Sequence, residues 1–308
     1  MSFGSATVLP VMSDRYRTVD VPTRGGALRV GIWEPSSGDP DAPPVLAVHG
    51  ITASHRSWLT VAQRLPGVRV IAPDLRGRGR SHELPGPFGI TAHADDLARV
   101  LDHLDVPAAS VMGHSMGGFV TVATVHRHPD RVAGVVLVDG GLPLPIPAGM
   151  TPDEVTAAIL GPVQRRLSMT FADHEAYRDF FRAHPAFTEW TDATTDYVDY
   201  DLVGEPGNYR PATSFEAMSA DSRAQQDGQD WLLPGLAALP AGTPFLRAPR
   251  GLLNEEPGLF PAPWVQRWAA EFPAVDVREV AGTNHYTLLL AEAGVAAITD
   301  ALTGPRRA

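Results

Sequence analysis

The segment Gly113-His114-Ser115-Met116-Gly117 constrains the fold of this chain more than any other stretch, because it holds one serine between two glycines. The residues before it, ASVM, are typical of a buried β-strand, and those after it, GFVTVATV, are interpreted as a helix that ends near His128. G-x-S-x-G between a strand and a helix is the pattern of a nucleophile elbow, a strained turn that projects the serine hydroxyl. Side chains at Gly113 and Gly117 would collide with the neighbouring strand and helix, so both positions require glycine.

Apolar runs rich in β-branched residues alternate with helical patterns along most of the chain, which predicts a mostly parallel sheet flanked by helices. The expected strands are RTVDVPT and ALRVGIWEP, as an opening antiparallel pair, then PPVLAVHG, VRVIAPD, ASVMGHS, VAGVVLVDGG, TPFLRAPRG and AVDVREVAG. Helices are expected at about 54–65, 91–104, 264–272 and 286–302, besides the one that follows Ser115.

The interval 143–242 differs in character from the rest. It opens with the proline-rich LPLPIPAG, contains amphipathic helical segments at 152–169 and 173–181, and shows no convincing strand. It holds 11 of the 23 aromatic residues, which either form the roof of an apolar cavity or fill the interval's own core. We expect a core formed by 1–142 and 243–308, with 143–242 inserted as a helical cap.

Composition excludes several partners and chemistries. A formal net charge of −10 argues against nucleic acid and anionic membranes, which attract basic surfaces. The chain has no cysteine and no lysine, which excludes disulfides, thiolate metal sites and Schiff-base chemistry. The N-terminal residues lack the pattern of a signal peptide, and no run approaches the roughly 20 apolar residues of a membrane-spanning helix. We therefore expect a cytoplasmic protein.

Metal and cofactor motifs are also missing from the sequence. No pair of histidines has a convincing metal-ligand spacing beside carboxylates, and no glycine-rich loop has the flanks that phosphate binding requires. We expect no metal and no cofactor, and a small molecule as the partner. The sequence gives no indication of the oligomeric state.

Three further features accompany the elbow: His49-Gly50 closes an earlier strand, DLRGRGRS spans Asp74 to Ser81, and His285 follows the last strand. This combination resembles the α/β-hydrolase fold family over nearly the whole chain, apart from the cap and the first dozen residues. The resemblance implies a mostly parallel eight-stranded sheet flanked by helices, with an inserted helical cap. It also implies that the DLRGRGRS loop, including Arg76, Arg78 and Arg80, is structural.

The resemblance also assigns roles to residues. Ser115 would be the nucleophile, and His285 the base that takes its proton, because a serine hydroxyl is a weak nucleophile at neutral pH. The backbone N–H groups of Ile51 and Met116 would form the oxyanion hole.

The third member of the triad departs from the family pattern. Gly-x-x-Asp is expected after the penultimate strand, but Gly251-Leu252-Leu253-Asn254 offers an amide where a carboxylate is needed to stabilise the imidazolium. Asp139, at the end of VVLVDGG, and Glu255 are the carboxylates that could substitute. We favour Asp139 over Glu255, with Asn254 as a third candidate.

The sequence thus predicts a serine hydrolase that cleaves a carboxylic ester or lactone of a bulky, largely apolar small molecule. A carbon–carbon bond hydrolase with the same serine is the main alternative. A small-ligand receptor that retains the triad without using it is a further alternative, and the doubtful acid is the feature that points to it.

Overall fold

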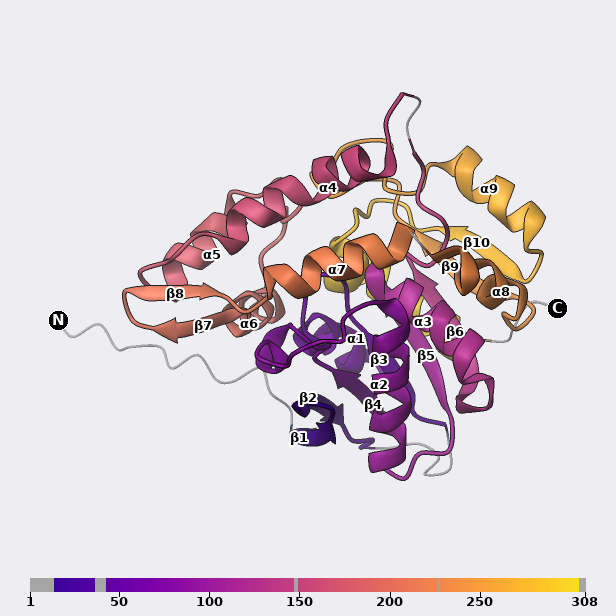
Figure 1. The fold of residues 1–308 in the computed structure, drawn as a ribbon, viewed down its shortest axis with the longest axis horizontal. Coiled ribbons are helices and arrows are strands. Elements are labelled where there is room, and N and C mark those ends of the chain that lie inside the picture. Colours follow the sequence, from indigo (N-terminus) through magenta and orange to yellow (C-terminus); the bar gives the residue numbers. More distant parts are fainter. Residues whose placement is uncertain (1–13, 37–42, 147–148, 227, 305–308) are drawn as a thin grey trace.

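The computed structural model describes residues 14–36, 43–146, 149–226 and 228–304, and its centre is one eight-stranded sheet (Figure 1). The order of its strands is β1-β2-β4-β3-β5-β6-β9-β10; β1 and β2 pair antiparallel, as do β2 and β4, and the other neighbours are parallel. The predicted sheet is therefore confirmed. Its strands are β1 (Tyr16–Thr23), β2 (Gly26–Trp33), β3 (Val45–Val48), β4 (Val70–Pro73), β5 (Ala109–His114), β6 (Val132–Val138), β9 (Thr243–Arg247) and β10 (Val275–Glu279).

Helices cover both faces of the sheet, so its central strands are buried on both sides. In β3, Leu46 and Val48 join the apolar cluster under one helical layer, and Val45 and Ala47 join the cluster under the other. The first layer contains α2 (Ile90–His103), α3 (Met116–Arg127), α8 (Leu232–Ala237) and α9 (Ala262–Glu271). The second contains α1 (Leu59–Arg64), α10 (Thr287–Leu290) and α11 (Glu292–Thr303).

The strand order reverses direction at β3. From β3 the chain passes to β4 on one side and then returns to β5 on the other. Ligands bind beyond the carboxyl ends of the strands at such a switch point. His49-Gly50 follows β3 and Ser115 follows β5, so both motifs lie at this position.

Residues 143–242, which lie between β6 and β9, are called the insertion below. Its elements before α8 lie along one side of the sheet in Figure 1, and α7 contacts both α4 and α2. They are α4 (Pro152–Leu167), α5 (His174–Arg182), α6 (Asp192–Tyr200), β7 (Leu202–Glu205), β8 (Asn208–Pro211) and α7 (Phe215–Gln226). The insertion also contains α8, which packs on α3 in the core layer.

Two local expectations were wrong. The insertion does contain strands, because β7 and β8 form a hairpin; each has only four residues, too few to show an alternating pattern. The expected helix 286–302 is two helices, α10 and α11, separated by Ala291 in an extended conformation.

Candidate active site

Ser115 occupies a strained turn between β5 and α3, with φ 55° and ψ −123°. A Cβ at Gly113 would lie 2.0 Å from the carbonyl oxygen of Gly117, and a Cβ at Gly117 would lie 2.0 Å from the carbonyl oxygen of Val48. Real Cβ atoms do not approach backbone so closely, so glycine is obligatory at both positions. As predicted, a side chain at Gly113 would collide with the helix, and a side chain at Gly117 would collide with the neighbouring strand.

Two further glycines complete this packing, and sequence analysis missed them. A Cβ at Gly140 would lie 2.0 Å from the carbonyl oxygen of Ser115, and a Cβ at Gly118 would lie 2.3 Å from that of Gly140. The turn after β6 therefore packs directly against the backbone of the elbow. The pairs Gly117-Gly118 and Gly140-Gly141 were the signal that could have revealed it.

The same turn carries Asp139, whose carboxylate contacts His285. The distance between His285 Nδ1 and Asp139 Oδ2 is 2.7 Å, and both residues are buried. Because an ionised carboxylate only accepts hydrogen bonds, Nδ1 carries the proton, and in a neutral ring Nε2 is left as the acceptor. Asp139 Oδ1 also accepts a bond from the Ala248 amide at 3.1 Å. Asp139 has a φ of 46°, a left-handed conformation that aspartate tolerates better than most residues.

The structure does not bring Glu255 or Asn254 to His285 in the same way. Glu255 is exposed, and its Oε2 accepts a bond from the Leu253 amide at 2.7 Å, within its own loop. Asn254 Oδ1 accepts a bond from Asn284 Nδ2 at 3.2 Å. Asn254, which occupies the position where the family pattern has an aspartate, thus links its own loop to the loop of Asn284 through their side-chain amides.

Ser115 and His285 line the same cavity, together with Ile51. The insertion contributes Val163 and Tyr197 to the lining of this cavity. The elbow, the loop after β3 and the loop after β10 therefore meet around one cavity.

His114, the variable residue of the elbow, is also part of this site. Its Nε2 donates a hydrogen bond to the carbonyl oxygen of His285 at 2.8 Å, because a carbonyl can only accept. Burial, helped by the neighbouring imidazole of His285, holds the pKa of His114 well below its ordinary value. A neutral His114 therefore fixes the backbone that carries His285, a role sequence analysis did not assign.

The loop after β3, which carries Ile51 as one of the two expected oxyanion donors, is fixed by His49. Its Nε2 accepts a hydrogen bond from the Leu75 amide at 2.9 Å, so the proton resides on Nδ1, which donates to the carbonyl oxygen of Gly50 at 2.7 Å. Burial lowers the pKa of His49 to about 4, which keeps this tautomer neutral. A Cβ at Gly50 would lie 3.2 Å from the Cβ of Ser115, so the loop passes close to the elbow.

Arg78 contacts both residues whose amides were expected to bind the oxyanion. Its Nε donates to the carbonyl oxygen of Ile51 at 2.9 Å, and its Nη2 lies 4.0 Å from the sulfur of Met116. Its guanidinium also forms a fully buried ion pair with Asp221 of α7. Arg78 therefore links the site to the insertion, although the sequence indicated only a structural role for its loop.

Asp221 of α7 binds three residues of the core. Its carboxylate binds Arg78, accepts a bond from His93 Nε2 at 2.9 Å, and accepts one from the Gly89 amide at 2.5 Å. Burial acts to raise the pKa of Asp221, but the charges of His93 and Arg78 outweigh it and hold that pKa below its ordinary value. Asp221 therefore stays ionised and attaches α7 to the core.

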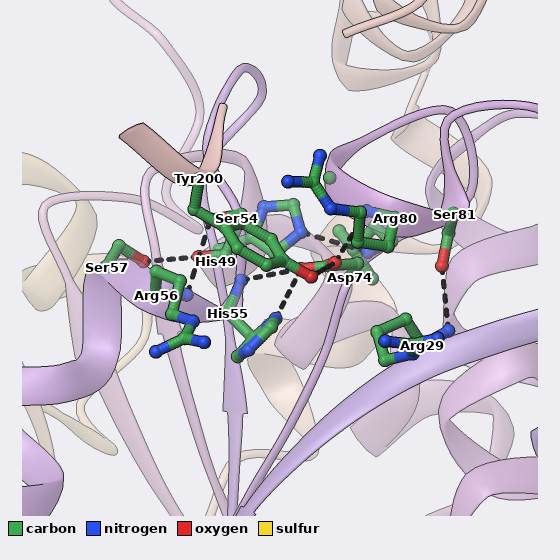
Figure 2. Close-up of polar contacts among 12 residues, drawn as sticks. Arg29, His49, Ser54, His55, Arg56, Ser57, Asp74, Arg80, Ser81 and Tyr200 are labelled. Carbon is green, nitrogen blue, oxygen red and sulfur yellow. Dashed lines mark hydrogen bonds and ion pairs between the residues drawn. The ribbon is translucent and has the colours of Figure 1, made fainter. Parts of the chain in front are cut away.

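Asp74 is a second buried attachment point, shown in Figure 2. Its Oδ1 binds His55 Nδ1 at 2.7 Å, and its Oδ2 accepts a bond from the hydroxyl of Tyr200, in α6 of the insertion, at 2.8 Å. The Arg80 amide donates to the same oxygen at 2.8 Å. This cluster joins the loop after β4 to the insertion, which agrees with the structural role that the resemblance implied for the DLRGRGRS loop.

Among the residues that the structure describes, no three histidine, aspartate or glutamate side chains are grouped as a metal site would require. Within that part of the chain, no helix has the length and apolar character needed to cross a bilayer.

A family model described as alpha/beta hydrolase fold matches residues 43–203, which is more than half of the chain. The lipase LipV of Mycobacterium tuberculosis is 34% identical over 158 residues, which are 51% of this chain and 55% of the lipase. The bifunctional esterase/perhydrolase DCH of Acinetobacter calcoaceticus is 35% identical over 152 residues, 48% of this chain and 53% of that protein. The chain thus spans about half the length of these curated relatives.

Solved structures match over a longer range. The crystal structure of E-2-(acetamidomethylene)succinate hydrolase superposes with a TM-score of 0.72 at 24% identity, covering 93% of this chain and 98% of that one. A thermophilic esterase from Thermogutta terrifontis gives a TM-score of 0.64 at 23% identity, covering 94% of this chain and all of that one. At these identities the likeness establishes the fold.

Proposed function

The chain belongs to the α/β-hydrolase fold family, and on that premise we propose that it cleaves a carboxylic ester or lactone through an acyl-enzyme on Ser115. The observation that carries the proposal is the buried contact between His285 and Asp139, with His285 in the wall of a cavity that Ser115 also lines. A hydroxyl, an imidazole and a carboxylate in this relation are the parts that nucleophilic acyl transfer needs.

In the proposed reaction, Ser115 attacks the ester carbonyl while His285 Nε2 takes the hydroxyl proton. Asp139 holds the ring in the required tautomer and stabilises the imidazolium that forms. The amides of Ile51 and Met116 bind the developing oxyanion, and Arg78 holds the Ile51 peptide in place.

His285 gives its proton to the leaving alcohol, and the acyl-enzyme results. The acyl-enzyme is then hydrolysed as His285 takes a proton from the attacking water and returns it to Ser115 Oγ when the acid leaves. The strained φ of Ser115 supports this role, because strain of this kind persists where a surrounding structure imposes it and is concentrated at functional sites.

The insertion acts as the roof of the site in this proposal. Its Val163 and Tyr197 line the cavity, and Leu252, Leu289 and Leu290 of the core also line it. Apolar side chains from both parts of the chain favour a bulky, largely apolar substrate. Names such as lipase and esterase among the relatives support an ester as the substrate.

The proposal is tested by assaying a panel of esters, lactones and vinylogous diketones with the wild type and Ser115→Ala. We expect hydrolysis of an ester or lactone, and a loss of at least about 10³-fold in kcat in the variant, because the nucleophile is removed. A loss of less than tenfold would refute the acyl-enzyme. Cleavage of the diketones alone would establish carbon–carbon bond hydrolysis instead, and no turnover of any compound would favour the receptor.

A further inference from the structure

Two cavities meet at Ser115. The first is the one already described, which His285 lines. The second is lined by Phe119, Leu144 and Gln225, among others. The two share Ile51, Ser115 and Leu259 and otherwise have different linings. Ser115 therefore lies at the junction of two spaces.

The position of His285 distinguishes the two cavities. Of the residues described here, His285 lines the first cavity and not the second, whereas its partner Asp139 lines the second. An alcohol that leaves the tetrahedral intermediate must be within hydrogen-bond reach of the imidazole that protonates it. We propose that the first cavity binds the alcohol half of the substrate, that the second binds the acyl half, and that both halves are uncharged. This assignment rests on the function proposed above.

The reaction sequence gives this assignment a kinetic consequence. The bond from Ser115 Oγ to the carbonyl carbon forms as the proton of Oγ passes to His285. The carbon–oxygen bond to the alcohol then breaks, and the same proton goes to the departing alkoxide. The alcohol leaves the first cavity, while the acyl chain stays covalently bound in the second. Water then enters the first cavity, and its oxygen bonds to the carbonyl carbon as its proton passes to His285. The bond from that carbon to Ser115 Oγ then breaks, His285 gives the proton to Oγ, and the acid is released.

The linings also indicate that neither half carries a charge. The described residues that line the two cavities include no arginine, lysine or glutamate. The carboxylate present, Asp139, is already bonded to His285 and to the Ala248 amide. A carboxylate or ammonium on the substrate would lose its hydration without gaining an opposite charge. Ser222, Gln225 and Gln226 line the second cavity and can bind an uncharged hydroxyl or carbonyl of the acyl chain.

Three leucines provide a matched test of the assignment. Leu144 lines the second cavity, Leu252 lines the first, and Leu253 is 50% exposed and serves as the control. Each is replaced by alanine, and a series of esters with varied acyl chains and varied alcohols is followed by rapid mixing. The alcohol released in the burst reports acylation, and the decay of the preformed acyl-enzyme reports deacylation.

We expect Leu144→Ala to change the deacylation rate constant by about tenfold and to shift the preferred acyl chain length, since the acyl chain remains in the second cavity. Leu252→Ala should alter the dependence on the alcohol and leave deacylation of a given acyl group unchanged. Leu253→Ala should match the wild type. If Leu144→Ala does not fold, Leu144→Val is used in its place.

The opposite pattern, with deacylation sensitive to Leu252 and alcohol preference sensitive to Leu144, would overturn the assignment and leave the acyl-enzyme intact. The absence of any burst or acyl-enzyme with every ester would instead count against the proposed function.

The charge of the substrate is tested with one alcohol esterified to butanoic acid and to succinic acid. We expect the butanoate to have about 100-fold higher kcat/KM, because the free carboxylate of the succinate ester would be buried without a partner. Equal values would contradict the inference that both halves are uncharged.

Discussion

The elbow and the insertion are held in place by different kinds of contact. Around Ser115, glycines bring the backbones of β3, β5, α3 and the turn after β6 into direct contact, so Ser115 and the turn that carries Asp139 have fixed relative positions. The elements of the insertion that lie before α8 are attached to the core by buried polar side chains, with Asp221 bound to Arg78 and Tyr200 bound to Asp74. Backbone packing thus positions Ser115 and Asp139, whereas buried polar contacts help to hold the insertion on the core.

This difference predicts that substitutions in the two regions have separable effects. An isosteric substitution in the candidate active site should lower kcat and leave the free energy of unfolding nearly unchanged. A change at a buried attachment should lower the free energy of unfolding first, because it leaves a charge without its partner.

The largest effect is expected for Asp139→Asn. Asparagine accepts the left-handed φ and can still bind the Ala248 amide, but it cannot stabilise the imidazolium of His285. We expect kcat to fall by about 10³-fold, equivalent to about 4 kcal/mol, with little change in thermal stability. Glu255→Gln is the control, and kcat should stay within about twofold of the wild type. A large loss in the control with none in Asp139→Asn would make Glu255 the acid.

A smaller effect, and one mainly on stability, is expected for Asp221→Asn. The buried guanidinium of Arg78 would lose its carboxylate, so we expect the free energy of unfolding to fall by about 3 kcal/mol in denaturant titrations. The control is Asp199→Asn, which removes the partner of Arg178 in an ion pair nearer the surface. We expect this variant to change the free energy of unfolding by less than about 1 kcal/mol. Equal losses in the two variants would show that the buried pair does not hold α7 in the way we infer.

The smallest of these effects depends on pH. The pKa of His49 is about 4 in the folded protein, below the ordinary value of about 6.5 that applies to the unfolded chain. As pH falls from 7 to 5, the unfolded state therefore binds a proton that the folded state does not, and folding loses about 2 kcal/mol from this group. His49→Gln should remove that part of the decline, which is measured as the difference between two stability profiles. Identical slopes for the wild type and the variant would contradict the lowered pKa.

The parts of the site that could be predicted from sequence are those fixed by local pattern. Ser115 lies in a five-residue motif at the end of a strand, and His285 follows the last strand, so their places in the fold follow from the order of the elements. The sheet follows from the same alternation of apolar runs.

Contacts between distant residues were beyond this kind of reasoning. Arg78 and Asp221 are 143 positions apart, and no spacing relates them. Sequence analysis favoured Asp139 over Glu255, but the contact of Asp139 with His285 depends on the orientation of the turn after β6, which no local pattern specifies. The hairpin of β7 and β8 was missed because strands of four residues are too short to show an alternation of apolar and polar residues.

The central claim is that His285 activates Ser115, and covalent labelling with a fluorophosphonate tests it most directly. The wild type and His285→Ala are reacted under the same conditions, and the labelled peptide is identified by mass spectrometry. We predict that the label is on Ser115 in the wild type and that labelling of His285→Ala is slower by at least about 10³-fold. A label on another residue, or an unchanged rate in His285→Ala, would contradict the account.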